Sequence, residues 1–325
     1  MTDPLDGREL FRRYPGNPVL TARDWPHMVN AVFNPAAVAV QGETWLFVRV
    51  EDRTGLSHLT LARSRDGYSN WTVERDRSLM PDTGSWVERW GVEDPRITVI
   101  DGRYHICYTG YSSSGPLVCL ARTDDFRTFE RLGVVQVPEN KDAALFPRRI
   151  GDRWAMLHRP VSTVGHLQAH IWISWSDDLR YWGDPTPLIE ARSGGWWDAN
   201  KVGLGPPPLE TSEGWLVLYH GVRLTASGSL YRLGLALLEL EQPTHVIARG
   251  DEWVFGPCAP YEVAGDVPDV VFPCGWLLGD DGDTLRMYYG AADSTVAVAT
   301  ASLSDLLDHL AGHGGAQTGR ARSRR

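Results

Sequence analysis

Short apolar runs separated by turn residues recur along most of the chain, and they have the length and composition of β-strands. Each round begins near a proline, continues with an aromatic run after a glycine turn, and ends with a run of small residues. The prolines that open these rounds are spaced 52 to 66 residues apart. They are Pro35, Pro95, Pro147, Pro207 and Pro273.

Five rounds of several short strands at such a period are typical of a β-propeller, in which each round forms one radial sheet. The alternative is an all-β sandwich, which gives evenly spaced strands but no higher repeat. The sequence therefore predicts an all-β fold, a five-bladed β-propeller over residues 31–312. This domain carries the candidate catalytic residues.

The segments on either side of the repeats have a different character. Residues 1–30 are irregular and interrupted by prolines, which predicts an extended N-terminal arm. Ser302 precedes a run with helical periodicity that extends to residue 312 and predicts a short C-terminal helix. Residues 313–325 are rich in glycine and arginine and are predicted to form a disordered basic tail.

Composition supports a globular protein and narrows its partners. Hydrophobic residues make up 42 % and charged residues 22 % of the chain, and the net charge is −9 despite four arginines near the C-terminus. An acidic chain argues against a nucleic-acid or anionic-membrane partner. No signal-peptide pattern or long apolar run is visible, so we expect a soluble, cytoplasmic protein. Four cysteines without Cys-x-x-Cys spacing indicate buried thiols and no disulfide framework: Cys107, Cys119, Cys258 and Cys274.

Polar residues occupy corresponding places in several rounds. If each proline opens the innermost strand of a blade, the residues beside it converge on the central channel, as do residues that end the second strands. One such residue is usually a satisfied structural group, but six at corresponding places indicate a polar pocket at the axis. The six are Asn34, Arg49, Asp94, Arg159, His220 and Asp293.

A group of basic residues comes from the third and fourth rounds. Lys141 and Lys201 precede inner strands, while Arg159 and His220 end the strands that follow. Such a set favours a small dianion such as phosphate, although each cation alone is more simply a surface charge over apolar neighbours. No nucleophile elbow, P-loop, dinucleotide fingerprint or zinc spacing is present, so no metal or cofactor is assigned.

The motif Glu93-Asp94-Pro95-Arg96 lies at the centre of a wider resemblance. Together with Asn34-Pro35, Arg49 and residues 141–147, 158–160, 201–203, 215–221 and 288–293, it resembles glycoside hydrolase family 130, the β-mannoside phosphorylase family. The resemblance covers about residues 15–310 and implies the same five-bladed β-propeller.

The resemblance also implies a reaction. Asp94 would be the only catalytic carboxylate and would protonate the glycosidic oxygen through the 3-hydroxyl of a mannosyl unit, so a closed channel is expected to keep it protonated. Inorganic phosphate, the co-substrate, would attack the anomeric carbon with inversion and give α-D-mannose 1-phosphate. Carried over by motif, the substrate-binding residues are Asn34, Arg49, Glu93 and Asp293, and the phosphate-binding residues are Lys141, Arg159, Lys201 and His220.

Several alternatives stay open on the sequence. A β-1,2-mannosidase of the same fold would use water, but such relatives lack the phosphate cations. An arabinanase-type glycosidase needs a carboxylate where this chain has Asn34, and a non-catalytic glycan-binding propeller would use exposed tryptophans such as Trp86, Trp90, Trp196 and Trp197. Lys141 replaces an arginine of some relatives, and residues 256–260 depart from the family pattern near the acceptor subsite. The linkage, β-1,2 or β-1,4, the acceptor sugar and a homo-oligomer through residues 1–30 are left open.

Overall fold

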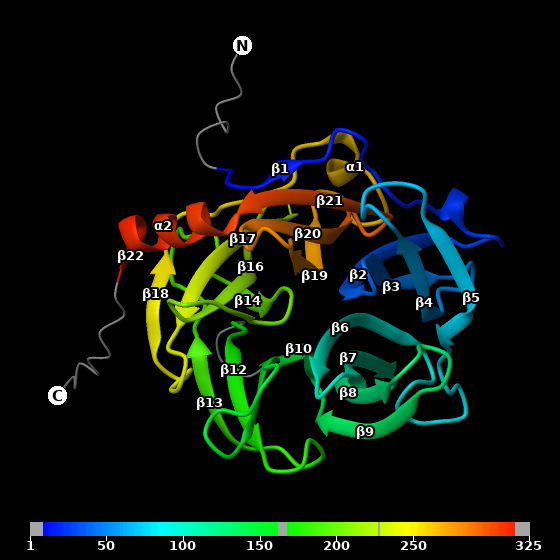
Figure 1. Ribbon diagram of the computed structural model, residues 1–325, viewed down its shortest axis with the longest axis horizontal. Coiled ribbons are helices and arrows are strands. Elements are labelled where there is room, and N and C mark those ends of the chain that lie inside the picture. The colour runs from blue at the N-terminus through cyan, green and yellow to red at the C-terminus, as the bar shows by residue number, and fades with distance from the viewer. Residues whose placement is uncertain (1–8, 162–167, 227, 316–325) are drawn as a thin grey trace.

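Five antiparallel sheets are arranged like the blades of a wheel in the computed structural model, which describes residues 9–161, 168–226 and 228–315 (Figure 1). The innermost strands of the blades are β2, β6, β10, β14 and β19, and they surround the centre of the molecule. The prediction of a five-bladed β-propeller is confirmed.

The first three blades each contain four strands in chain order. Blade one consists of β2 (Ala31–Val40), β3 (Glu43–Glu51), β4 (Ser57–Ser64) and β5 (Thr72–Leu79). Blade two consists of β6 (Val92–Ile100), β7 (Arg103–Ser112), β8 (Gly115–Thr123) and β9 (Glu130–Gln136). Blade three consists of β10 (Asn140–Leu145), β11 (Trp154–Pro160), β12 (Ile171–Ser176) and β13 (Gly183–Ile189).

Blades four and five depart from this plan. Blade four consists of β14 (Lys201–Leu204), β15 (Leu209–Glu210), β16 (Trp215–Thr225), β17 (Gly228–Leu238), β18 (Val246–Gly250) and β22 (Gly314–Gly315). Blade five consists of β19 (Val271–Leu278), β20 (Thr284–Ala291), β21 (Thr295–Ser302) and β1 (Arg12–Arg13). The outer strand of the last blade therefore comes from the start of the chain, which closes the ring.

Apolar side chains on both faces of each strand form the core between neighbouring blades. On β16, Leu216 and Leu218 pack toward blade five, while Val217 and Tyr219 pack toward blade three. Successive side chains point to opposite faces of a strand, so a sheet buried on both faces reads as a continuous apolar run. These runs are the segments that the sequence predicted as strands.

The sequence predicted that the recurring prolines open the innermost strands, but the structure places them elsewhere. Pro35 and Pro95 lie inside β2 and β6, within irregular stretches of the pairing between Phe33 and Ala36 and between Glu93 and Arg96. Proline has no N–H to donate, so it is tolerated at a bulge where the ladder is already interrupted. Pro147 follows the end of β10. The corresponding bulge in blade three lies before this proline, between Lys141 and Ala144.

The terminal segments belong to the propeller more closely than predicted. The arm contributes β1 and the 3₁₀ helix η1 (Ala22–Asp24), and α2 (Leu303–His313) continues into β22, which pairs with β18. The prediction of a disordered tail is wrong for residues 313–315, because this pairing extends the sheet of blade four. Residues 316–325 lie outside the described part of the chain.

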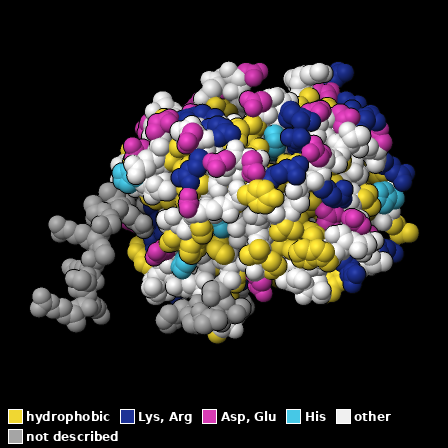
Figure 2. Space-filling model, turned by 90° about the horizontal axis from the view of Figure 1, so that it is seen from below, with side chains coloured by type: hydrophobic (Ala, Val, Ile, Leu, Met, Phe, Trp, Pro, Cys, Tyr) yellow, Lys and Arg dark blue, Asp and Glu magenta, His cyan; other side chains and the backbone are white. Residues whose placement is uncertain are grey.

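Other features concern the helices, the cysteines and the surface. The remaining helix, α1 (Pro260–Val263), is short, and within the described residues no helix has the length and apolar character to cross a membrane. Cys107, Cys119 and Cys274 are buried as predicted, whereas Cys258 is exposed. Basic and acidic side chains are interspersed on the flank seen in Figure 2.

Candidate active site

Three polar residues occupy equivalent positions at the bulges of the first three innermost strands. Asn34, Asp94 and Asp142 have φ angles of 46°, 49° and 54°, in the left-handed region that asparagine and aspartate tolerate better than other non-glycine residues. All three are buried. The bulges turn these side chains away from the alternation of their strands and toward one another at the axis.

Asp94 is the centre of this arrangement. Its Oδ1 accepts hydrogen bonds from Asn34 Nδ2 at 2.8 Å and from Arg49 Nη1 at 3.0 Å. Lys141 Nζ lies 3.9 Å from its Oδ2. Arg49 also donates from Nη2 to Glu93 Oε1 at 3.0 Å, so one guanidinium holds both carboxylates of the Glu93-Asp94 pair.

The protonation state of Asp94 differs from the expectation. Burial raises the pKa of the Asp94 carboxyl, but the charges of Arg49 and Lys141 and the hydrogen bond from Asn34 outweigh burial and hold the pKa below its ordinary value. The carboxyl is therefore an anion in the ligand-free channel at neutral pH. Burial in the channel does favour the protonated form, as the sequence predicted, but the prediction did not include the cations, which outweigh burial in this state.

Arg96 connects the blades across the axis. This fully buried side chain donates from Nε to the carbonyl oxygen of Gly205 at 2.7 Å and from Nη2 to that of Leu204 at 2.8 Å. Its Nη1 donates to the backbone carbonyl of Asp94 at 3.2 Å. Arg96 thus fixes the backbone of the Asp94 bulge to the end of β14 in blade four.

The basic residues predicted for phosphate gather around Asp142. Arg159 Nε donates to Asp142 Oδ2 at 2.7 Å, and His220 Nε2 lies 3.7 Å from the same oxygen. Burial, followed by the charges of Arg159 and Lys141, lowers the pKa of Lys201, which indicates that the three cations share one region. The structure therefore brings the four predicted residues into one region around Asp142, where Lys141 also lies near Asp94.

His220 is neutral in this environment. Burial lowers its pKa to about 3, even though Asp142 favours the charged form. Its Nδ1 is buried and has no hydrogen-bond partner among the described groups. His220 therefore adds no positive charge to those of Lys141, Arg159 and Lys201. Its unused nitrogen can instead accept a hydrogen bond from a ligand or donate one to it.

Asp293 lies in the turn between β20 and β21, with a φ of 49°. Burial and then the negative charge of Asp94 raise its pKa to about 6. Arg49 partly opposes this shift, so the Asp293 carboxyl, Asp94 and Arg49 belong to one electrostatic group.

Two glycines make room for the site. A Cβ on Gly290 would overlap Asn34 Oδ1 and lie 2.7 Å from the Asn34 nitrogen, and a Cβ on Gly203 would lie 2.6 Å from Asp142 Oδ2. Both positions therefore require glycine as long as the polar side chains keep their places.

Sequence reasoning missed Asp142, Arg96 and Tyr231. Asp142 had a usable signal, because it precedes two alanines and a leucine, much as Asn34-Pro35 precedes two alanines and a valine. Arg96 was part of the motif, but nothing in the sequence indicates that it reaches blade four. Tyr231 is half-buried on β17, and its pKa is raised by burial and then affected by Lys141 and Asp142, which indicates that it borders the site.

No metal is implied by the donor set. Within the described ranges, no three His, Cys, Asp or Glu side chains gather closely enough to hold a metal ion.

Comparisons with known proteins extend over nearly the whole chain. A family model for glycoside hydrolase family 130, described as beta-1,4-mannooligosaccharide phosphorylase, matches residues 10–311. The beta-1,4-mannooligosaccharide phosphorylase of Ruminococcus albus is 33 % identical over 318 residues, covering 95 % of this chain and 93 % of that protein. The 1,2-beta-oligomannan phosphorylase of a Thermoanaerobacter species is 37 % identical over 309 residues, covering 91 % of this chain and 98 % of that protein.

A solved structure of a mannoside phosphorylase also matches nearly the whole chain. The beta-1,2-mannobiose phosphorylase of Listeria innocua, in complex with beta-1,2-mannobiose, superposes with a TM-score of 0.85 at 33 % sequence identity. The match covers 93 % of this chain and 99 % of that one.

Proposed function

The chain belongs to glycoside hydrolase family 130, and from this membership and its axial site we propose that it is an inverting β-mannoside phosphorylase. It would cleave a β-mannoside with inorganic phosphate and release α-D-mannose 1-phosphate and a shortened saccharide. The named relatives act on β-1,4- or β-1,2-linked mannosides, so the proposal covers both linkages.

One observation carries the proposal: the buried carboxylate of Asp94 lies beside a basic region. Of the other carboxylates here, Glu93 binds Arg49 and Asp142 binds Arg159, while the family resemblance assigns Asp293 to the mannosyl unit. An inverting hydrolase needs a second carboxylate that is free to activate water. Phosphate is already an anion and instead needs cations at its site, which Lys141, Arg159 and Lys201 supply.

The reaction balances in atoms and charge. A phosphate oxygen forms a bond to the anomeric carbon while the bond from that carbon to the glycosidic oxygen breaks. The electron pair of the broken bond remains on the leaving oxygen, which takes the proton of Asp94 by way of the mannosyl 3-hydroxyl. The proton carried by hydrogen phosphate then returns Asp94 to its acid form, so the cycle needs no further co-reactant.

Asp94 is an anion in the ligand-free channel and becomes a proton donor when phosphate binds. Lys141 lies 3.9 Å from Asp94 and helps to lower the pKa of that carboxyl. A phosphate dianion held by Lys141, Arg159 and Lys201 offsets these charges and raises the pKa of Asp94. The acid is therefore formed when the nucleophile is in place.

The test combines phosphate dependence with removal of the acid. Purified protein is incubated with β-1,2- and β-1,4-mannobiose and longer β-mannosides, with and without phosphate, and sugar phosphates are identified by NMR. We expect α-D-mannose 1-phosphate only in the presence of phosphate. Free mannose released at the same rate without phosphate would identify a hydrolase.

Asp94→Asn is the matched variant, because it keeps the shape of the side chain and removes the proton. General acid catalysis contributes roughly 10²- to 10⁴-fold, so kcat should fall by about that factor while saccharide binding is retained. Turnover equal to that of the wild type would remove Asp94 from the role of general acid.

A further inference from the structure

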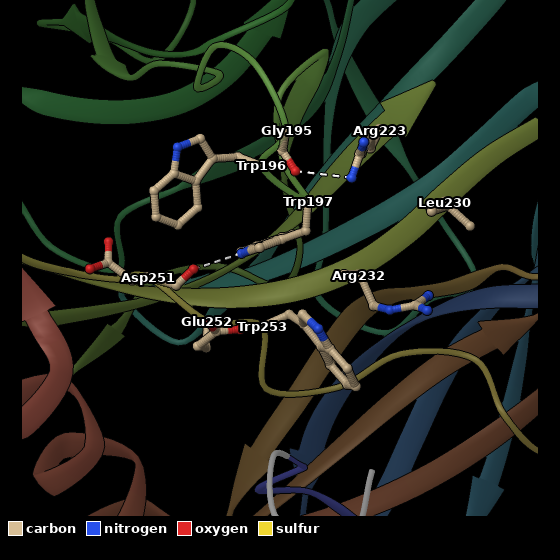
Figure 3. Close-up of a pocket in the computed structure, with 9 residues that line it drawn as sticks. All are labelled: Gly195, Trp196, Trp197, Arg223, Leu230, Arg232, Asp251, Glu252 and Trp253. Atoms are coloured by element: carbon tan, nitrogen blue, oxygen red, sulfur yellow. Dashed lines mark hydrogen bonds between the residues drawn. The ribbon is translucent and has the colours of Figure 1, made fainter. Parts of the chain in front are cut away.

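A second cleft, of about 480 Å³, lies on blade four and does not include the residues of the axial site (Figure 3). Its walls are formed by the segment before β14, the β16–β17 hairpin and the segment after β18. The side chains that characterise it are Trp196, Trp197, Arg223, Arg232, Glu252 and Trp253. A volume of this size is within the range of small-molecule sites.

The cleft and the axial site use opposite faces of the same hairpin. Gly221 pairs with Arg232, and Arg223 pairs with Leu230, so these residues share one face of the β16–β17 ribbon. His220 and Tyr231 are the neighbours of Gly221 and Arg232 in sequence and therefore lie on the other face. The cleft is thus a separate site behind a strand that borders the axial site.

Three indole rings form rigid surfaces in this cleft. Trp197 donates from Nε1 to the carbonyl oxygen of Asp251 at 2.9 Å and stacks on Tyr219 with ring centroids 5.6 Å apart. Trp253 is buried and has the Arg232 guanidinium 5.0 Å above its ring. Trp196 is 42 % exposed, with Arg192 4.4 Å over its ring.

Such surfaces suit a sugar ring. Trp supplies a large flat contact area with few rotatable bonds, so little conformational entropy is lost when a ligand packs on it. Trp196 is anchored on one side by Arg192, which is itself held by Asp251 at 2.9 Å, and its exposure leaves area for a ligand. An apolar sugar face can pack there as it does on other aromatic platforms.

The polar groups of the cleft suit the hydroxyl groups of a ligand. Arg232 is half-buried, and within the described part of the chain no carboxylate lies within ion-pair distance of it. Glu252 is exposed and likewise makes no ion pair with a described residue. Arg223 and Arg232 each donate to a backbone carbonyl oxygen, of Gly195 and Tyr231, and make no ion pair with a described residue. Their remaining N–H groups and the Glu252 carboxylate are donors and an acceptor that can bind the hydroxyl groups of one ligand.

We propose that this cleft is a second carbohydrate-binding site, which binds a neutral oligosaccharide away from the bond that is cleaved. The choice of a β-mannooligosaccharide as its occupant rests on the proposed function, whereas the cleft itself does not. Such a site would keep longer saccharides on the enzyme between turnovers and would have no effect on the shortest substrate.

The test observes the cleft directly, without phosphate and therefore without turnover. Protein labelled with fluorinated tryptophan is titrated with β-1,4-mannohexaose, and the resonance of Trp196 is assigned by its loss in Trp196→Phe. We expect this resonance to shift saturably. Trp196→Ala should weaken saccharide binding at the cleft roughly threefold to tenfold, as measured from the resonances of Trp197 and Trp253. Trp196→Phe keeps a flat ring and should retain most of the affinity.

Activity and a matched variant separate this inference from the proposed function. Phosphorolysis of mannobiose should be the same in the wild type and in Trp196→Ala. Tyr181→Ala, which removes an exposed ring of blade three, should bind the saccharide as the wild type does.

An unshifted Trp196 resonance in a protein that still phosphorolyses mannobiose would overturn the cleft alone. A shifted resonance in a protein that phosphorolyses no β-mannoside would support the cleft and overturn the proposed function. A change in oligomeric state in Trp196→Ala, with no response to saccharide, would identify a self-association surface and overturn the proposal.

Discussion

Two carboxyl groups at the axis, those of Asp94 and Asp293, are shifted in opposite directions by their neighbours. Both are desolvated, which favours the protonated form. Asp94 has Arg49 and Lys141 close by and is held in the charged form, whereas Asp293 faces the negative charge of Asp94 and has a pKa raised to about 6. Folding therefore disfavours the charged form of Asp293.

This shift gives a prediction for stability against pH. The folded state binds more protons than the unfolded state between the ordinary pKa of Asp293, 3.8, and its folded value of about 6. Stability contributed by this group is therefore present below about pH 4 and lost as the pH rises through about 6. Asp293→Asn should make the protein more stable than the wild type at pH 7, with the difference vanishing near pH 4, as measured by urea denaturation.

The same variant should bind its β-mannoside less tightly, since the resemblance assigns Asp293 to the mannosyl unit. Asp152→Asn serves as the control, because Asp152 is exposed in a turn of blade three and its replacement should change stability by close to zero. A destabilised Asp293→Asn at pH 7 would mean that Arg49 outweighs burial at this position.

At the scale of elements, the innermost strands place the site because their ladders are interrupted. A regular strand would send Asn34, Asp94 and Asp142 to the face that strict alternation dictates. The bulges instead hold these residues at positive φ, and Arg96 secures the bulge of β6 to blade four. Glycines in the facing strands leave the space that the polar side chains occupy.

Gly290→Ala tests this arrangement. The added methyl group would overlap Asn34 Oδ1 and displace the side chain that donates to Asp94 at 2.8 Å. A hydrogen bond to a charged group contributes about 1.5–3 kcal/mol, so kcat/KM should fall by roughly tenfold to a hundredfold. The measurement is steady-state phosphorolysis.

Gly183→Ala is the matched control for this variant. A Cβ at Gly183 meets no atom within 4 Å, so activity should remain at the wild-type level. Equal activity of the two variants would show that Asn34 is not needed where the structure places it.

At the scale of the whole molecule, the ring is closed by the start of the chain. Arg12 pairs with Thr300 and Arg13 with Ala299, so β1 completes the sheet of blade five. Arg13 Nε donates to Glu262 at 2.8 Å, and the fully buried Glu262 also accepts from Tyr289 at 2.7 Å. The arm is thus tied to the blade by a ladder and an ion pair to a buried carboxylate.

Arg13→Ala should destabilise the propeller, because it removes the cationic partner of a buried carboxylate. Breaking such a pair costs about 3–5 kcal/mol in the free energy of unfolding. Arg12→Ala, at the exposed neighbouring position, should change it by less than about 0.5 kcal/mol. Thermal and urea denaturation of the two variants would show the difference, and equal stability would indicate that the arm does not hold the ring closed.

The repeating apolar runs determined the fold. The Glu93-Asp94 motif and the basic residues of the third and fourth rounds identified the candidate site residues. Local patterns suffice for these conclusions, because strand length, turn chemistry and motif spacing are properties of contiguous sequence. The same reasoning identified Trp196 and Trp197 as candidate sugar-stacking residues.

Only the tertiary structure decided which residues meet and how they are charged. The bulge register placed Asp142 beside Arg159, and the packing of blade four placed Trp253 in the same cleft as Trp196. The pKa of Asp94 depends on cations from blades one and three, which lie 45 and 47 residues away along the chain. Register and electrostatics sum over neighbours that come together only when the ring closes, so no contiguous stretch of the sequence contains them.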